Sequence, residues 1–135
     1  MAYVLDTSAV LAVLLAEPGR EPLVKLLEEE SAGAGRGILM PFMTLMEMQY
    51  RLMRSVPAGD ALTAVRLVEA WPVQVVESNP TWRQRAAELK SRGGLSLGDA
   101  WIASLAFLRD AELVHRDQQF DRVEGLRALH LQARK

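Results

Sequence analysis

The chain has 135 residues, of which 50% are hydrophobic and none is cysteine, and its formal net charge is -1. This length and composition predict a single domain over residues 1–135 with a substantial core. The absence of cysteine excludes disulfides, thiolate zinc sites and cysteine nucleophiles, and it is compatible with a cytoplasmic protein. No apolar run approaches the length of a membrane span and the N-terminus lacks a basic signal region, so we expect no membrane partner.

Short apolar segments alternate with helical patterns along the chain. Strands are predicted at residues 3–5, 38–40, 73–76, 112–115 and 126–131. Helices are predicted at residues 9–16, 22–30, 44–54, 60–71, 80–91 and 96–109. This alternation indicates an α/β fold, a three-layer α/β/α sandwich around a mostly parallel sheet of about five strands.

Four acidic residues stand where predicted strands end or predicted helices begin. Asp6 directly follows the first strand, and Asp117 follows the fourth. Glu47 and Asp99 lie in the first turns of two helices. Sites in open parallel sheets form beyond the carboxyl ends of the strands, so we expect at least three of these acids to meet at one edge of the sheet.

Each of these acids also has a structural explanation. The stretches Thr44–Glu47 and Ser96–Asp99 fit the capping box, in which an acid bonds back to the first residue of a helix. Asp6 could cap the helix that follows it, and Asp117 could be a turn residue. Glu47 could also pair with Arg51 one turn further on.

Capping alone does not account for the whole set of acids. Asp99 shares a helix face with the apolar residues at positions 102, 103 and 106, so its carboxylate should be partly buried. Four carboxylates at one edge would repel one another and raise their pKa values unless a cation neutralised them. Mg²⁺ and Mn²⁺ prefer such all-oxygen ligand sets, which favours a divalent metal site.

Four stretches, in this order and at this spacing, resemble the PIN domain family: VLDTSAVL, MTLMEMQYRL, LSLGDAWIASLA and LVHRDQQF. Over its whole length the chain is similar to the compact form of that family, the VapC-type toxins of bacterial toxin-antitoxin pairs. The resemblance implies a PIN-like fold and a Mg²⁺- or Mn²⁺-dependent endoribonuclease, the toxin of a type II module. The implied catalytic and metal-binding acids are Asp6, Glu47, Asp99 and Asp117.

The resemblance also implies auxiliary residues and partners. The hydroxyl of Thr7, or less favourably of Ser8, would contact water or metal. The implied partners are an RNA substrate, a cognate antitoxin protein that covers the active site, and a second copy in a homodimer. Methionines at positions 40, 43, 46, 48 and 53 fit either core packing or an apolar groove for a partner helix.

Aromatic residues are candidates for RNA binding. Trp71, Trp82 and Trp101 could stack on bases. Core packing is the better interpretation for Trp71 and Trp101, because both occupy helical settings. The residues that would bind RNA are therefore left unassigned.

Two positions depart from the family pattern. His115 stands where the family commonly has Thr or Ser, and Gln119 stands where it often has another acid. Asp121 could replace that acid, or it could be an exposed turn residue. The departures keep open an alternative function, a catalytically inactive PIN-like module that binds RNA or protein.

A rival ribonuclease mechanism uses two histidines as acid and base. It would have to use His115 and His130, the only histidines of the chain. Such an enzyme would work in EDTA and leave a cyclic phosphate. A metal-activated water would instead require the metal and leave 5'-phosphate and 3'-hydroxyl ends.

Overall fold

The computed structural model describes residues 1–132, and its sheet has five strands in the order β3-β2-β1-β4-β5, all of them parallel. The strands are β1 (Tyr3–Leu5), β2 (Ile38–Pro41), β3 (Gln74–Val76), β4 (Glu112–His115) and β5 (Ala128–His130). The predicted α/β fold with about five strands is confirmed, and the sheet is wholly rather than mostly parallel.

The helices alternate with the strands as predicted. They are α1 (Thr7–Leu14), α2 (Glu21–Ser31), α3 (Thr44–Met53), α4 (Ala58–Glu69), α5 (Pro80–Ser91) and α6 (Leu97–Leu108). A short 3-10 helix, η1 (Gln118–Arg122), was not predicted. The start of α1 lies two residues earlier than predicted because Asp6 is its N-cap. Among the described helices, none combines the length and the apolar character needed to cross a membrane.

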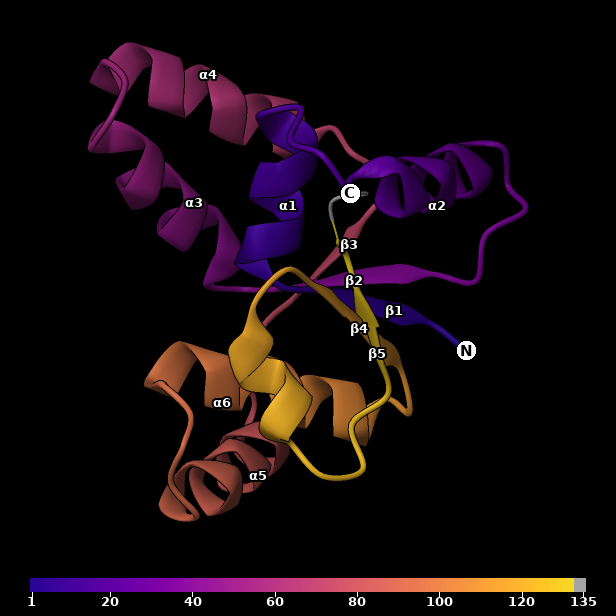
Figure 1. The fold of residues 1–135 in the computed structure, drawn as a ribbon, viewed down its shortest axis with the longest axis vertical. Coiled ribbons are helices and arrows are strands. Elements are labelled where there is room, and N and C mark those ends of the chain that lie inside the picture. The colour runs from indigo at the N-terminus through magenta and orange to yellow at the C-terminus, as the bar shows by residue number, and fades with distance from the viewer. Residues whose placement is uncertain (133–135) are drawn as a thin grey trace.

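Alternate residues of the strands face two separate cores, one on each side of the sheet. Leu5, Met40 and Val114 pack with α1, α2, α3 and α4 on one face. Their neighbours Val4, Leu39 and Leu113 pack with α5, α6 and η1 on the other. Figure 1 shows the two groups of helices on opposite sides of the sheet. The predicted three-layer sandwich is therefore confirmed.

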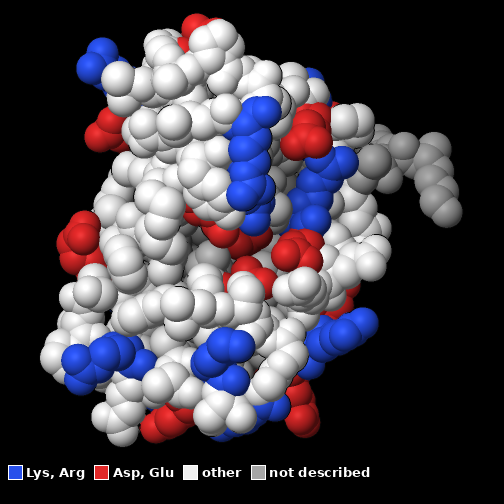
Figure 2. Space-filling view, turned by 90° about the vertical axis from the view of Figure 1, so that its left-hand side faces the viewer, with Lys and Arg blue, Asp and Glu red and all other residues white. Residues whose placement is uncertain are grey.

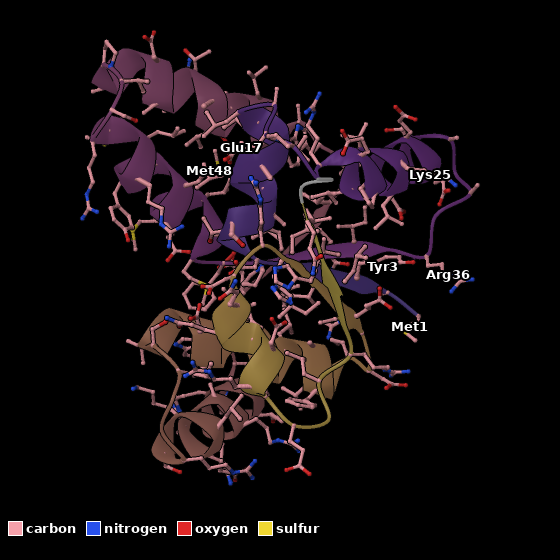
Figure 3. All side chains as sticks on the ribbon, viewed as in Figure 1. Met1, Tyr3, Glu17, Lys25, Arg36 and Met48 are labelled. Carbon is pink, nitrogen blue, oxygen red and sulfur yellow. The ribbon has the colours of Figure 1, made fainter. Side chains whose placement is uncertain are left out.

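The methionines divide between the core and the surface. Met40 and Met48 are fully buried, and Figure 3 shows Met48 between α3 and α1. Met46 and Met53 lie on the same helix α3 but are 62% and 52% exposed. The interpretation as core residues is therefore correct for Met40 and Met48 and wrong for Met46 and Met53.

Trp82 anchors the core beneath α5 and α6. Its side chain is 1% exposed, and its ring meets Phe42 and Trp101 edge to face, with centroids 5.7 and 4.9 Å away. The indole N–H donates to the Trp101 carbonyl at 2.8 Å and to the Ser104 hydroxyl at 3.0 Å. Trp82 is therefore committed to packing and cannot stack on a base. Trp101, as expected, packs against this same core.

This arrangement predicts a large loss of stability for Trp82→Ala. Removing the ring leaves a cavity, and the free energy of unfolding should fall by about 3–5 kcal/mol. Trp82→Phe keeps most of the apolar volume but loses the N–H donor, so its cost should be smaller, about 1–2 kcal/mol. Urea denaturation of both variants measures these costs, and a loss below about 1 kcal/mol for Trp82→Ala would contradict the packing described.

Candidate active site

The four acids come from four separate segments and lie on one face of the molecule, although within residues 1–132 no three of their carboxylates come within 4.8 Å of one another. Asp6 follows β1, Glu47 is in the first turn of α3, Asp99 is in the first turn of α6, and Asp117 follows β4. The charges of Glu47 and Asp99 both act on Asp6, and those of Asp117 and Glu47 act on Asp99. Figure 2 views the face beyond the carboxyl end of β1 and shows acidic side chains gathered in a hollow there.

Asp6 is the most buried of the four acids. Only 4% of its surface is exposed, and it caps α1 by accepting hydrogen bonds from the backbone N–H and the hydroxyl of Ser8. Burial raises the pKa of Asp6 from 3.8 to about 6, with smaller contributions from the negative charges of Asp99 and Glu47. The Ser8 hydrogen bonds oppose this rise but do not cancel it.

Ser8 connects the ends of two neighbouring strands. Its hydroxyl donates to Asp6 and accepts from the backbone N–H of Arg116 at 2.9 Å, so it joins the end of β1 to the end of β4. Thr7 is fully buried, and its hydroxyl has no hydrogen-bond partner among residues 1–132. Of the two predicted auxiliary hydroxyls, the structure therefore brings Ser8, not Thr7, into contact with Asp6.

Asp99 shows one half of the capping box together with the partial burial that its helix face predicts. Ser96 is the N-cap of α6, and its hydroxyl accepts from the Asp99 N–H at 3.1 Å. The Asp99 carboxylate is nevertheless partly buried, and this burial, followed by the charges of Asp117 and Glu47, raises its pKa. The hydrogen bond of Ser96 and the charge of Arg51 act in the opposite direction.

Glu47 does not belong to a capping box. The N-cap of α3 is Met43, which makes no side-chain cap bond, and Thr44 is buried inside the helix. The Glu47 carboxylate pairs instead with Arg51 at 3.4 Å, as the helical spacing predicts. It also lies against the start of α6, because a Cβ atom on Gly98 would stand 4.0 Å from Glu47 Oε2.

Asp117 and Asp121 face different surroundings. Asp117 caps η1 by accepting from the Gln119 N–H at 3.0 Å, and its charge acts on Asp99. Asp121 lies beside two histidines, with Oδ2 3.4 Å from His130 Nδ1 and Oδ1 3.9 Å from His115 Nε2. Asp121, which could replace the missing acid or be an exposed turn residue, is thus half-exposed and lies beside the two histidines.

The charges at this edge are largely uncompensated. In the described part of the chain, Glu47 is the only one of the four acids that forms an ion pair with a basic residue. A buried carboxylate without a positive partner costs free energy, and all four donors are carboxylate oxygens. This donor set fits Mg²⁺ or Mn²⁺ rather than a thiophilic metal.

A second group of potential ligands was missed by the sequence reasoning. His115, Asp121 and His130 place their ligand atoms within 4.8 Å of one another, and over residues 1–132 no other three such side chains do so. The two histidines stand opposite each other in the pairing of β4 with β5. No signal in the sequence gives this pairing, because the order of the strands cannot be obtained from their order in the chain.

The raised pKa of Asp6 predicts that Asp6→Asn increases the stability of the metal-free protein. In the native protein Asp6 binds its proton more tightly than in the unfolded chain, so the stability that this group contributes falls as the pH rises from 3.8 through about 6 and is fully lost above that value. The shift from 3.8 to about 6 corresponds to about 3 kcal/mol at pH 7.5, decreasing to about 1 kcal/mol near pH 4.5. In EDTA, Asp6→Asn should therefore stabilise the protein by about 1–3 kcal/mol at neutral pH and by less in acid.

Urea denaturation at the two pH values measures this difference. The matched control is Asp60→Asn, an exposed aspartate on α4 that should change stability by less than about 0.5 kcal/mol. If Asp6→Asn instead destabilises the protein at neutral pH, the charged Asp6 carboxylate stabilises the metal-free fold. That result would contradict the prediction, which rests on the burial of Asp6.

Comparison with known proteins gives one family and several structural relatives. The model of the PIN domain matches residues 3–126. No curated protein sequence matches significantly. Among solved structures, VapBC2 from Rickettsia felis bound to a promoter DNA fragment has a TM-score of 0.77 and 21% identity, covering 98% of this chain and 100% of that chain.

Two further structures have the same fold at similar identity. DNA-bound VapBC from Salmonella typhimurium has a TM-score of 0.77 and 19% identity, covering 97% of this chain and 98% of that chain. VapC20 from Mycobacterium tuberculosis, described as a sarcin-ricin loop cleaving toxin, has a TM-score of 0.68 and 20% identity, covering 88% and 92%. Since the family model spans β1 to β4 and all six α-helices, and ends just before β5, the chain belongs to the PIN domain family.

Proposed function

We propose that this protein is a metal-dependent endoribonuclease, the VapC-type toxin of a type II toxin-antitoxin module that acts in the cytoplasm. Its catalytic and metal-binding residues are Asp6, Glu47, Asp99 and Asp117. The cofactor is Mg²⁺ or Mn²⁺, and the substrate is an RNA phosphodiester.

The observation that carries this proposal is the uncompensated burial of Asp6 beside other acids. Asp6 is almost fully buried, has no basic partner among the described residues, and feels the negative charges of Glu47 and Asp99. A purely structural helix cap does not need this environment, because an exposed Asp, Ser or Asn caps equally well. A cation shared by these carboxylates would offset the cost of burying them.

The residues of the chain have separate tasks in the proposed reaction. Asp6, fixed by Ser8, and Asp99, fixed by the first turn of α6, provide rigid oxygen ligands. Glu47 and Asp117 complete the ligand set from α3 and from the segment after β4. A bound divalent ion would lower the pKa of a water and offset negative charge on the phosphate. Arg51, ion-paired with Glu47, lies at the margin of the acids and can contact the RNA backbone.

The proposed partners follow from the relatives and from the surface of α3. Several solved structures with this fold are of VapBC toxin-antitoxin systems, which supports a cognate antitoxin. On α3, Met46, Tyr50 and Met53 expose apolar surface of the kind that protein partners cover. We assign this surface to protein partners, the antitoxin and a second copy in a homodimer, rather than to RNA.

Cleavage assays test the proposed activity. Purified protein is incubated with total cellular RNA in Mn²⁺, in Mg²⁺ and in EDTA, and the ends of new fragments are mapped. Cleavage should require the metal and leave 5'-phosphates. The variant Asp6→Asn/Asp99→Asn should lose at least about a hundredfold in rate, because it removes groups that control charge at the reacting phosphate.

Asp60→Asn, which alters an exposed acid on α4, is the control and should cleave like the wild type. Cleavage that persists in the double variant would reveal a contaminating ribonuclease or a different site. Cyclic phosphate ends formed in EDTA would indicate the two-histidine mechanism. RNA or protein binding without any cleavage would instead favour the inactive binding module.

A further inference from the structure

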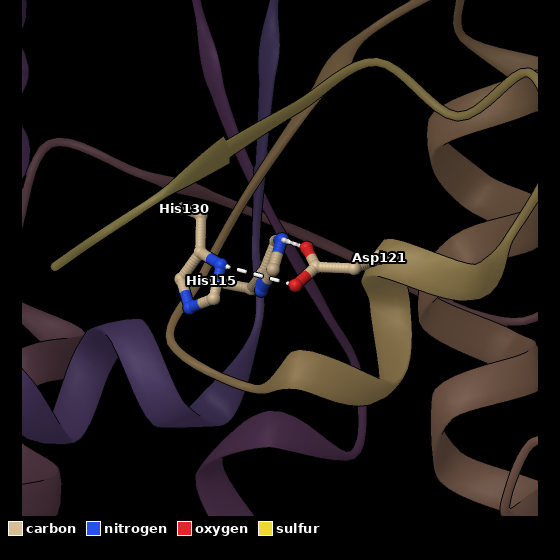
Figure 4. Close-up of side chains that lie close together, drawn as sticks. All are labelled: His115, Asp121 and His130. Carbon is tan, nitrogen blue, oxygen red and sulfur yellow. Dashed lines mark ion pairs between the residues drawn. The ribbon is translucent and has the colours of Figure 1, made fainter.

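His115 ends strand β4 and is enclosed on all sides. It is fully buried, and its ring packs against Phe120 and His130, whose ring centroids are 5.1 and 4.6 Å away. Its two nitrogens face different groups. Nδ1 accepts a hydrogen bond from the backbone N–H of Asp117 at 3.2 Å, and Nε2 faces Asp121 Oδ1 at 3.9 Å. Figure 4 shows the Asp121 carboxylate next to both imidazole rings.

These contacts define which nitrogen of His115 carries the proton. A neutral imidazole has one N–H donor and one acceptor nitrogen. Because Nδ1 accepts from the Asp117 amide, the proton is on Nε2, which has no hydrogen-bond partner among residues 1–132 and has Asp121 Oδ1 3.9 Å away. The negative charge of Asp121 favours this tautomer. The other oxygen of Asp121 lies 3.4 Å from His130 Nδ1.

The same three side chains are of the types that bind zinc, and their ligand atoms lie within 4.8 Å of one another. The hydrogen bond at Nδ1 argues against this use. To bind a metal through Nε2, His115 would have to move its proton to Nδ1, directly against the N–H of Asp117. Histidines that bind metals normally donate through their other nitrogen, whereas this one accepts.

We propose that His115 is a positioning residue for Asp117, and that Asp121 selects the tautomer that allows it. His115 Nδ1 fixes the Asp117 amide on one side, and the Asp117 carboxylate accepts from the Gln119 amide on the other. The segment that carries the fourth acid is thereby attached to the buried end of β4. The importance of this role for catalysis rests on the proposed function, but the contact itself does not.

The tautomer can be measured in the wild-type protein without any variant. Long-range proton–nitrogen NMR spectra of the histidine rings, recorded in EDTA, should show His115 protonated on Nε2 and unprotonated on Nδ1. A proton on Nδ1 would overturn the proposal, because that nitrogen could no longer accept from Asp117.

Two matched substitutions separate the two nitrogens. In His115→Asn, the amide oxygen can stand at the position of Nδ1 and keep the acceptor. In His115→Gln, the amide reaches the position of Nε2 and leaves the place of Nδ1 without an acceptor. Both replace a buried ring by a smaller amide, so a general loss of packing should affect them alike. A positioning role should affect them differently.

Hydrogen–deuterium exchange of the Asp117 amide, measured in EDTA, reports the contact directly. Exchange in His115→Asn should stay close to the wild-type rate, and exchange in His115→Gln should be roughly tenfold faster, the effect of losing one hydrogen bond. Equal acceleration in both variants would overturn the proposal and leave His115 with a packing role only.

Mn²⁺ titration by calorimetry connects this contact to the acids. His115→Gln should bind Mn²⁺ about tenfold more weakly than the wild type, as is typical when a residue that orients a metal ligand is lost, and His115→Asn should bind nearly normally. Equal weakening in both variants would again overturn the proposal. If the wild type binds no Mn²⁺, the proposed function fails, while the exchange rates still decide the role of His115.

Zn²⁺ provides the test of the competing assignment. Titrated into Asp6→Asn/Asp99→Asn, which weakens the acidic cluster, Zn²⁺ should show no binding that depends on His130 or Asp121. Binding that disappears in both His130→Gln and Asp121→Asn would identify the three side chains as a metal site and overturn the positioning role.

Discussion

The hydrogen bonds of the Ser8 hydroxyl are the contacts on which the rest of the site depends. This one group donates to the Asp6 carboxylate and accepts from the backbone N–H of Arg116, and so connects the ends of β1 and β4. A buried carboxylate is costly, and without donors its ionised form would cost still more. Ser8 therefore reduces the cost of Asp6 and also places that acid relative to the segment that leads to Asp117.

Two of the four acids come from helices on opposite faces of the sheet. Glu47 comes from α3, above one face of the sheet, whereas Asp99 comes from α6, above the other. Their spacing is therefore set by two independent cores, one containing Met48 and the other containing Trp82. A packing change in either core would therefore shift one of these two acids relative to the other.

The sequence was informative where a short-range rule applies. Alternation of strand and helix gave the layers, and the strand-end rule brought Asp6 and Asp117 together, because they follow strands that prove to be neighbours. The rule for capping failed at Thr44, since tertiary packing buries this residue inside α3 and Met43 becomes the N-cap. The contact of His115 with His130 was out of reach, because it depends on β5 pairing with β4, and strand order is a property of the whole fold.

The central position of β1 has a consequence for synthesis of the protein. This strand is made first, yet it pairs with β2 on one side and with β4 on the other, where Val4 lies opposite Leu113. Pairing over such a long stretch of chain forms late in folding. On the ribosome, Asp6 emerges long before Asp99 and Asp117, so a partly synthesised chain lacks half of the acids. Under the proposed function, a chain still on the ribosome would therefore lack the complete set of acids needed to cleave RNA.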